Sequence, residues 1–330
     1  MRATRFTELV GCAVPIQVAP MGGITTPELG AAVVQAGGHA MFGLTGLPAE
    51  ALSGLLESYE SGCRRTYGVN FLLPFLSDDV LEIAGARAPL VEIYHGEPDR
   101  AVVDRIHGGG ALASWQVTSQ SEAFAAADAG CDLIVAHGVE AGGRMPGGIG
   151  LLPLLEQVLG RVDIPVLAAG GIATGRGFAA VLAAGADGLR MGTRFLASTE
   201  SGGHPTYVQA VVAAAAEDTT YTDRFNAMWP GGSRPPHRVL ASTITAAEAL
   251  PGEVVGEIQT PAGPLPLPKF GPSPPSNIIS GHIEAMPMYA GQSAGAIDEV
   301  LPAAEIVTRL VRGADELLGQ PVAAGASQGS

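Results

Sequence analysis

The chain has 330 residues, of which 47% are hydrophobic and 15% are charged, and its formal net charge is −14. The apolar share supports a sizeable buried core. An acidic chain lacks the basic face that nucleic-acid phosphates and anionic membrane surfaces attract, so we expect no nucleic-acid partner and no membrane partner. Lys269 is the sole lysine, which argues against Schiff-base chemistry.

Three cysteines, Cys12, Cys63 and Cys131, lack the paired spacing of a zinc site or a redox pair, and we expect no metal. They are typical of reduced thiols in a reducing compartment. The N-terminal stretch is too interrupted for a signal peptide. No window approaches the roughly 18 uncharged apolar residues of a membrane span. We therefore expect a cytoplasmic protein.

A short apolar run, then a glycine or polar residue, then an alanine-rich helical stretch recurs along the first 200 residues. One such helix is TPELGAAVVQAGG, with Thr26 and Pro27 placed as N-cap and first helical residue and Gly37 beyond its end. The expected strands cover residues 14–20, 39–46, 67–73, 89–95, 111–117, 132–138, 165–171 and 188–194.

Eight strand–helix units predict a (β/α)₈ TIM barrel, whose parallel strands need helical crossovers. An open doubly wound sheet would show the same alternation. We favour the barrel because the count reaches eight and no G-x-G-x-x-G motif follows the first strand.

The pattern changes after about residue 200, which predicts a barrel domain over 1–200 and a smaller, mainly helical and loop cap over 201–294. Residues 204–225 are expected to form one or two helices. The segment 251–275 holds eight prolines and is expected to be an ordered loop rather than a strand or helix. Residues 295–318 are expected to complete the barrel with a helix that places Ile306, Leu310 and Leu317 on one side. Residues 319–330 are expected to be disordered.

In a TIM barrel the functional groups lie at the carboxyl ends of the strands. Glycines follow the last two strands, in AAGGIATGRG and RMGTRF, and could cradle a phosphate with backbone N–H groups. Tight turns alone would also explain them, and the residues leave both readings open. The motif APMGG after the first strand could let a planar ring lie against backbone, or form a turn with a core methionine.

Several motifs, in order, are similar to those of the nitronate monooxygenase family, formerly called 2-nitropropane dioxygenase. They are PIQVAPMGGITTPELGAAVVQAGG, YGVNFLLP, HGVEAGGRMPGG, PVLAAGGIATGRGFAAVLAAGADGLRMGTRFLAS and MYAGQSAG. A flavin-dependent enoyl reductase of fatty-acid synthesis is related to the family. The resemblance implies an FMN-binding TIM barrel with a smaller helical domain over the flavin.

The resemblance also implies the cofactor-binding residues. A first group lies beside the flavin ring, a second forms the phosphate cradle, and a third belongs to a C-terminal motif that returns to the cofactor. These are Ala19, Pro20, Met21, Gly22, Asn70, Gln116 and Gly143; Ala169, Gly170, Gly171, Met191, Gly192 and Thr193; and Tyr289, Gly291, Gln292 and Ser293. Agreement with the strand-end pattern strengthens the phosphate interpretation.

The turn after the sixth strand departs from the family. Its usual form ends in a histidine, the proposed catalytic base or proton donor, where this chain has Arg144. His137 stands where the family has glutamine, and Gln116 stands where lysine is often found. An arginine stays protonated and cannot be a general base, but it can clamp an anion. We expect Arg144 to position an anionic group, with His137 as the alternative acid or base.

Two further side chains have open roles. Tyr289 could donate from its phenol to a reacting oxygen. Glu140 is expected to brace its loop by accepting backbone N–H bonds rather than to take part in catalysis.

These features predict an FMN-dependent monooxygenase that oxidises a small, anionic, nitronate-like substrate with dioxygen. The alternative enzyme is an NAD(P)H-dependent flavin reductase acting on a quinone or enoyl acceptor. A flavin- or phosphate-binding protein without turnover, and a sugar-phosphate lyase or isomerase barrel, are the other readings. A homodimer is compatible with the sequence, which does not fix the assembly.

Overall fold

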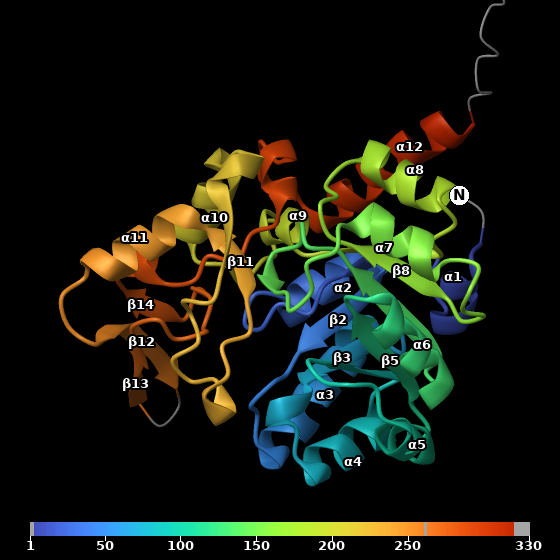
Figure 1. The fold of residues 1–330 in the computed structure, drawn as a ribbon, viewed down its shortest axis with the longest axis horizontal. Coiled ribbons are helices and arrows are strands. Elements are labelled where there is room, and N and C mark those ends of the chain that lie inside the picture. The colour runs from blue at the N-terminus through green and yellow to red at the C-terminus, as the bar shows by residue number, and fades with distance from the viewer. Residues whose placement is uncertain (1–2, 261–262, 320–330) are drawn as a thin grey trace, which may run out of the picture.

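A computed structural model describes residues 3–260 and 263–319 of the chain. Eight parallel strands form a closed barrel in the order β1-β2-β3-β4-β5-β6-β8-β9, with β9 pairing back to β1 (Figure 1). Closure excludes the open doubly wound sheet and confirms the (β/α)₈ barrel. The barrel strands are β1 (Ile16–Val18), β2 (His39–Gly43), β3 (Tyr67–Leu72), β4 (Leu90–Tyr94), β5 (Leu112–Val117), β6 (Leu133–His137), β8 (Val166–Ala169) and β9 (Gly188–Met191).

Side chains alternate between the inside and the outside of the barrel because successive residues of a strand point to opposite faces. In β4, Val91 and Ile93 belong to the large core between strands and helices, whereas Leu90 belongs to a separate cluster inside the barrel. Glu92 shares the inward phase of Leu90. The interior is therefore apolar at the amino ends of the strands and polar further along them.

Helices surround the strands, and α12 occupies the position that the helix after β9 would take. It packs against α8 and α2, and its residues Ile306 and Leu310 join the barrel core. Leu317, near the end of the helix, is 42% exposed, so the buried part of this face ends before it. The outer helices are α2 (Pro27–Gln35), α3 (Ala49–Cys63), α4 (Asp78–Arg87), α5 (Arg100–Gly109), α6 (Gln120–Ala129), α7 (Leu151–Val158), α8 (Gly175–Ala183) and α12 (Ala303–Leu318).

Local sequence explains where these elements begin and end. Thr26 caps α2 as expected, because its Oγ1 accepts a hydrogen bond from the N–H of Leu29 at 3.1 Å. Pro27, the first helical residue, has no backbone N–H and so leaves no donor unsatisfied there. At the amino end of the barrel, α1 (Arg5–Val10) places Phe6 in the interior cluster. Arg5 fixes this helix through two hydrogen bonds to Asp187, at 2.8 and 2.6 Å.

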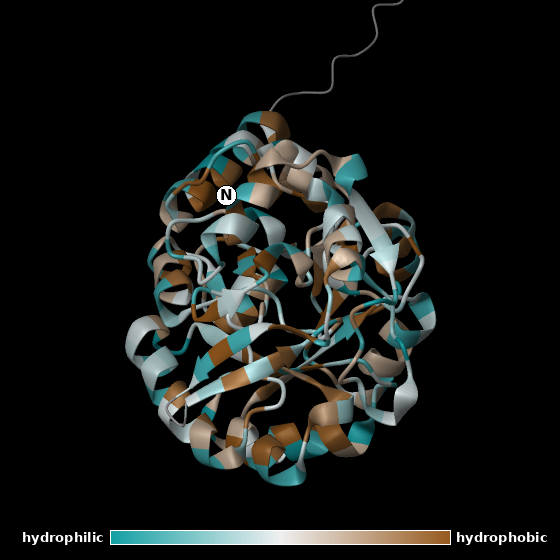
Figure 2. Ribbon diagram, turned by 90° about the vertical axis from the view of Figure 1, so that its left-hand side faces the viewer, coloured by the Kyte–Doolittle hydropathy of each residue, from teal (hydrophilic) through white to brown (hydrophobic). Residues whose placement is uncertain are grey.

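The cap contains strands that the sequence did not predict. The proline-rich segment includes β12 (Val254–Thr260) and β13 (Gly263–Pro268), so the expectation of a loop rather than a strand is wrong. Exposure alternates along β12, and Figure 2 shows that the cap strands facing the viewer carry both hydrophobic and hydrophilic residues. The sheet order β13-β12-β14 makes β13 an edge strand, with β14 at Ile279–Gly281. Pro264, Pro266 and Pro268 occupy every second position, where an edge strand tolerates the missing N–H groups.

Residues 204–225 also differ from the expectation of helices alone. They begin with α10 (Pro205–Ala213) but continue into β10 (Thr219–Thr222), which pairs with β11 (His237–Leu240). Threonine and tyrosine favour a pleated strand, which explains the change. The two-residue strand β7 (Gly143–Arg144) pairs with β11 and so joins the barrel's sixth loop to the cap. The short helix α9 (Thr193–Leu196) follows β9, and α11 (Ala241–Ala249) follows β11.

A second hydrophobic cluster holds the cap together and includes Tyr207, Phe225 and Met288. The domain division at residues 200 and 294 stays a prediction, and residues 320–330 of the expected tail lie outside the described residues. Across the described ranges, no helix is both long and apolar enough to cross a bilayer. Cys12, Cys63 and Cys131 are free thiols.

The packing of α12 predicts that replacing Leu310 with Ala lowers the free energy of unfolding by about 3 kcal/mol, because the side chain leaves a cavity in the barrel core. Leu310 is 3% exposed and Leu317 is 42% exposed. Leu317→Ala is therefore the matched control and should change stability by less than about 0.5 kcal/mol. Chemical denaturation measures both; equal effects would contradict the placement of α12.

Candidate active site at the carboxyl ends of the barrel strands

The loops after β1, β8 and β9 meet at the carboxyl rim of the barrel. The N–H of Ala19 donates to the carbonyl of Met191 at 2.8 Å. A Cβ atom on Gly192 would lie 3.3 Å from Sδ of Met21. The loops expected to contact the flavin ring and its phosphate are therefore neighbours, and their glycines leave main chain uncovered.

Backbone N–H groups in these loops are available to a ligand. Within the described part of the chain, the N–H groups of Gly171, Gly192 and Thr193 donate to no acceptor. Gly170 and Gly171 have φ of +115° and +70°, a region that glycine adopts without strain. Unpartnered amides beside bare backbone suit a phosphate, which accepts several hydrogen bonds at once.

The C-terminal motif returns to this rim. The N–H of Gly291 donates to Oγ1 of Thr193 at 3.0 Å, and the N–H of Gln292 donates to the carbonyl of Glu140 at 2.9 Å. A Cβ on Gly142 would lie 2.6 Å from the nitrogen of Gly291, so only glycine allows this approach. Ser293 is buried beside the same contacts.

A buried ion pair lies inside the barrel just below the rim. The guanidinium of Arg190 on β9 donates to both carboxylate oxygens of Glu92 on β4, at 2.7 and 2.5 Å. The side chains are 2% and 0% exposed. These strands are opposite one another in the closed order, so the pair spans the barrel.

Amide side chains complete the hydrogen bonding of this pair. Arg190 also donates to Oε1 of Gln17 at 2.7 Å and to Oε1 of Gln116 at 3.0 Å. Glu92 also accepts from Nδ2 of Asn70 at 2.8 Å. Asn70 and Gln116, both expected near the flavin, therefore belong to one network with residues that the sequence analysis missed. Single charged residues in the apolar strands LVEIY and GLRM were the signal that could have identified Glu92 and Arg190.

His137 ends β6 at the edge of this network. Its Nδ1 lies 2.7 Å from Nε2 of Gln116 and 3.3 Å from the hydroxyl of Tyr94. Burial, helped by the positive charge of Arg190, lowers the pKa of His137 to about 3. The ring is therefore neutral at physiological pH. Burial also raises the pKa of Tyr94, whose hydroxyl donates to the carbonyl of Arg144 at 2.9 Å.

The side chain of Arg144 extends into the cap. It donates to Oδ1 of Asn226 and, at 3.0 Å, to the carbonyl of Phe225. Its guanidinium carbon lies 4.6 Å from the ring centre of Trp229, a cation–π distance. Among the residues that the structure describes, no carboxylate pairs with Arg144. Burial lowers its pKa, yet a guanidinium remains protonated at any working pH.

Other polar groups surround this arginine. The hydroxyl of Tyr289 donates to the carbonyl of Pro272 at 2.9 Å, and its ring lies 5.7 Å from that of His237. His95 directly follows β4 with φ of +61°, and its buried Nε2 has no hydrogen-bond partner in the described chain. Its ring is 5.0 Å from Trp229, so it lies between barrel and cap.

The expected bracing role of Glu140 is confirmed. Both carboxylate oxygens accept from the N–H of Leu151, the first residue of α7, at 3.0 Å. A carboxylate at a helix N-terminus satisfies a free donor and opposes the positive end of the helix dipole. Glu140 therefore fixes the loop that carries Arg144.

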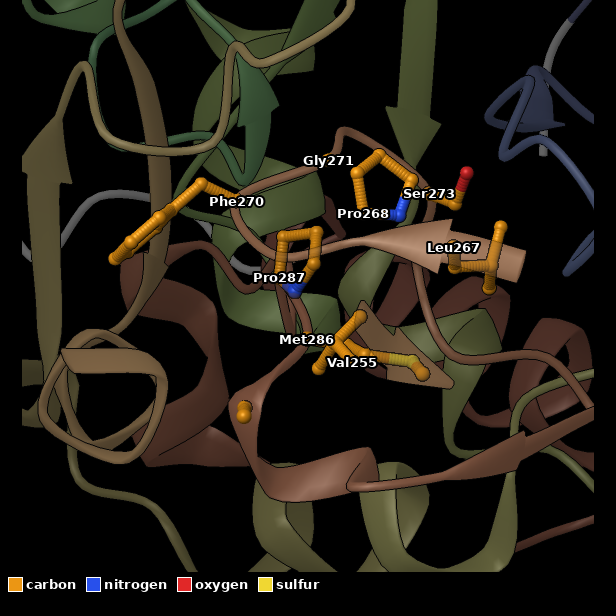
Figure 3. A pocket seen from close by; sticks show the side chains of 9 residues that line it. Val255, Leu267, Pro268, Phe270, Gly271, Ser273, Met286 and Pro287 are labelled. Carbon is orange, nitrogen blue, oxygen red and sulfur yellow. The ribbon is translucent and has the colours of Figure 1, made fainter. Parts of the chain in front are cut away.

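A small cavity lies within the cap, away from the rim loops. Figure 3 shows it between the hairpin strands and the segment of Met286 and Pro287. Its lining residues are Val255, Leu267, Pro268, Phe270, Gly271, Ser273, Ala285, Met286 and Pro287. None of them is titratable, so we do not assign the reaction to this cavity.

Comparison with known proteins shows a consistent family likeness. A family model for nitronate monooxygenase matches residues 48–313. The nitronate monooxygenase of Pseudomonas aeruginosa is 29% identical, and the alignment covers 96% of this chain and 99% of that protein. A nitroalkane oxidase from Streptomyces ansochromogenes, known from crystal structures, is 30% identical with a TM-score of 0.79, over 95% of this chain and 99% of that one.

A further relative is named for a different activity. A carboxyl-CoA dehydrogenase of Rhodococcus jostii, named for a substituted octahydroindene substrate, is 30% identical over 73% of this chain and 66% of that protein. The chain is therefore also similar to an enzyme named as a dehydrogenase.

The buried ion pair predicts a large loss of stability on removing one partner. Arg190→Met leaves Glu92 buried without its cation and should lower the free energy of unfolding by about 3–5 kcal/mol. Arg309→Met, which breaks exposed pairs with Glu299 and Glu305, is the control and should lower it by less than about 1 kcal/mol. Denaturant titration measures both. A loss from Arg190→Met as small as that of the control would contradict the network.

Proposed function

Because the chain belongs to the nitronate monooxygenase family and is an oxidoreductase, we propose that it binds FMN and oxidises a small, anionic, nitronate-type substrate with dioxygen. The family's flavin dependence supports a flavin cofactor. The choice of FMN rests on the uncovered amides at the rim, which suit a terminal phosphate. The observation that carries the substrate class is the cationic side chain of Arg144, which has no carboxylate partner in the described chain.

The residues at the rim fit such a cofactor. The N–H groups of Gly171, Gly192 and Thr193 would hold the phosphate. The main chain of Ala19, Pro20, Met21 and Gly22, together with Gly143, would lie beside the ring, since no atom lies within 4 Å of a Cβ built on Gly22 or Gly143. When bound, the flavin would take two electrons from the substrate and pass them to dioxygen.

The protein's own part is to attract and orient the substrate. A half-buried guanidinium that none of the described carboxylates neutralises creates a positive potential between the barrel and the cap, which favours an anion there. Nitronates are already deprotonated, so their oxidation needs charge stabilisation more than a base. The hydrogen bonds that Arg144 donates to Asn226 and Phe225, and its contact with the ring of Trp229, would fix the direction of that charge. Tyr289 could contact the substrate after its bond to Pro272 is exchanged.

A second candidate is supported by the dehydrogenase relative of Rhodococcus jostii. In that case the enzyme would exchange electrons with NAD(P)H and a quinone or enoyl acceptor, and Arg144 would bind a phosphate or carboxylate of one of these partners. Use of NAD(P)H, a homodimeric assembly and a cytoplasmic location stay predictions.

An anaerobic reduction series separates the two candidates. The FMN-loaded protein is mixed under nitrogen with propyl-2-nitronate, the neutral 2-nitropropane, NADH or NADPH, and the absorbance of oxidised flavin is followed. We expect rapid bleaching with the nitronate, slower bleaching with the nitroalkane, and recovery on adding air. Bleaching by a nicotinamide alone would support the reductase, and a protein that takes up no FMN would contradict both candidates.

The charge of Arg144 predicts a change in substrate binding. Arg144→Ala should raise KM for the nitronate by at least about tenfold, because a hydrogen bond to a charged group contributes about 1.5–3 kcal/mol. Asn226→Ala is the control, since it removes a contact between Arg144 and the cap but keeps the charge. Steady-state kinetics with both variants distinguish the roles. Equal increases in KM would show that Arg144 acts only by holding the cap.

A further inference from the structure

One chain of hydrogen bonds connects Arg190 to two histidines. In one direction it runs through Gln116 to His137, and in the other through Gln17 to His39. Arg190 is a donor at every nitrogen and accepts nothing. The direction of each bond in the chain can therefore be worked out outward from this residue.

The direction fixes the proton on His137. Since Arg190 can only donate, the side-chain oxygen of Gln116 accepts at 3.0 Å, and its amide nitrogen must face His137. An amide nitrogen only donates, so Nδ1 of His137, 2.7 Å away, accepts and carries no proton. Tyr94, the other neighbour of Nδ1, places its single proton on the carbonyl of Arg144. A neutral His137 therefore carries its proton on Nε2.

His39 gives an internal comparison. Gln17 accepts from Arg190 at 2.7 Å and faces Nδ1 of His39 with its amide nitrogen at 3.0 Å, so the same tautomer follows. Nε2 of His39 is buried without a partner, with the ring 5.8 Å from that of Phe6 at the closed end of the barrel. Nε2 of His137 also has no hydrogen-bond partner in the described chain, but it is not buried, and it lies at the open end.

The surroundings of His137 oppose its protonation. Tyr94 at the end of β4 lies beside the ring, the ring of His95 lies 4.4 Å from that of Tyr94, and Gln116 on β5 faces Nδ1. Arg190 on β9 adds positive charge through its contact with Gln116, with Glu92 as its counter-ion. A second proton on the ring would point at the NH₂ group of Gln116 and would be buried near Arg190.

We propose that His137 acts as a neutral hydrogen-bond donor, whose Nε2–H binds an electron-rich atom of the flavin or the substrate, and that Gln116 is the positioning residue that sets this tautomer. The identity of the bound group rests on the proposed function. A nitrogen that already carries a proton cannot take one from a neutral nitroalkane. His137 would then favour substrates that arrive deprotonated, which narrows the proposed substrate to the nitronate itself.

The tautomer is tested in the protein without flavin by NMR of ¹⁵N-labelled histidine rings, with His137→Gln used for assignment. We expect Nε2 of His137 to be protonated and Nδ1 unprotonated from about pH 5 to about pH 8, where a free histidine would titrate. Ionisation of the ring within that range, or a proton on Nδ1, would overturn the proposal. The measurement is made on the wild-type protein, and only the variant used for assignment must also fold.

Two matched variants test the role of the amide. Gln116→Glu replaces the donor beside His137 with an acceptor and should place a proton on Nδ1. Gln17→Glu makes the same charge change on the other side of Arg190. It should move the proton of His39 to Nδ1, while His137 keeps its proton on Nε2. A change at His137 in the second variant but not in the first would contradict the assignment of Gln116.

Ligand addition identifies the acceptor. The Nε2–H resonance of wild-type His137 is followed while FMN is added, and then nitrite as a non-reacting anion. A shift with FMN alone assigns the acceptor to the flavin, and a shift only with nitrite assigns it to the substrate. No shift in either case, with FMN bound by absorbance, overturns the donor role. Failure to bind FMN would contradict the proposed function, while the tautomer measured without flavin would still support the role of Gln116.

Discussion

The ion pair between Glu92 and Arg190 is the interaction on which the rest of the site depends. Each charge, buried alone, would destabilise the fold by several kcal/mol, so the barrel interior tolerates them only as a fully bonded pair. Two bonds between the partners, two that Arg190 donates to Gln17 and Gln116, and one that Glu92 accepts from Asn70 meet that requirement. Because the arginine only donates, the pair also orients the amides around it.

The layers of the barrel divide stability from chemistry. Apolar side chains, including that of Phe6 from α1, fill the amino end, and the ion pair occupies the middle. Above it the rim is largely main chain, where glycines keep amides available and let the loops approach closely. The polar middle layer therefore lies directly beneath the surface on which a planar cofactor could rest.

The cap is joined to the rim by main chain as well as by side chains. Gly142 and Gly291 bring two loops into backbone contact, β7 pairs with β11, and Arg144 reaches Asn226 and Phe225. Arg144 thus supplies a tether and a charge that has no carboxylate partner among the described residues. A shorter histidine at the same position could supply a proton but could not carry a permanent charge.

The strands and their order could be predicted from the sequence because apolar runs, glycine turns and helix caps such as Thr26 are local signals. The family motifs also located the rim loops. The interior network could not be predicted in the same way, since Glu92 and Arg190 are 98 residues apart and only barrel closure places them together. Similarly, the prolines in β13 indicate a loop unless the strand is known to be at the edge of its sheet. The cap residues that bind Arg144 are more than 80 residues away in the sequence, so no local pattern indicates them.

The most direct measurement of the central claim is a crystal structure of the protein grown with excess FMN. We predict that its phosphate binds the backbone amides after β8 and β9, that the ring lies against the main chain after β1, and that the Glu92–Arg190 pair remains intact below it. A phosphate bound elsewhere, or a rim covered by side chains so that no ring can reach the main chain, would contradict the account.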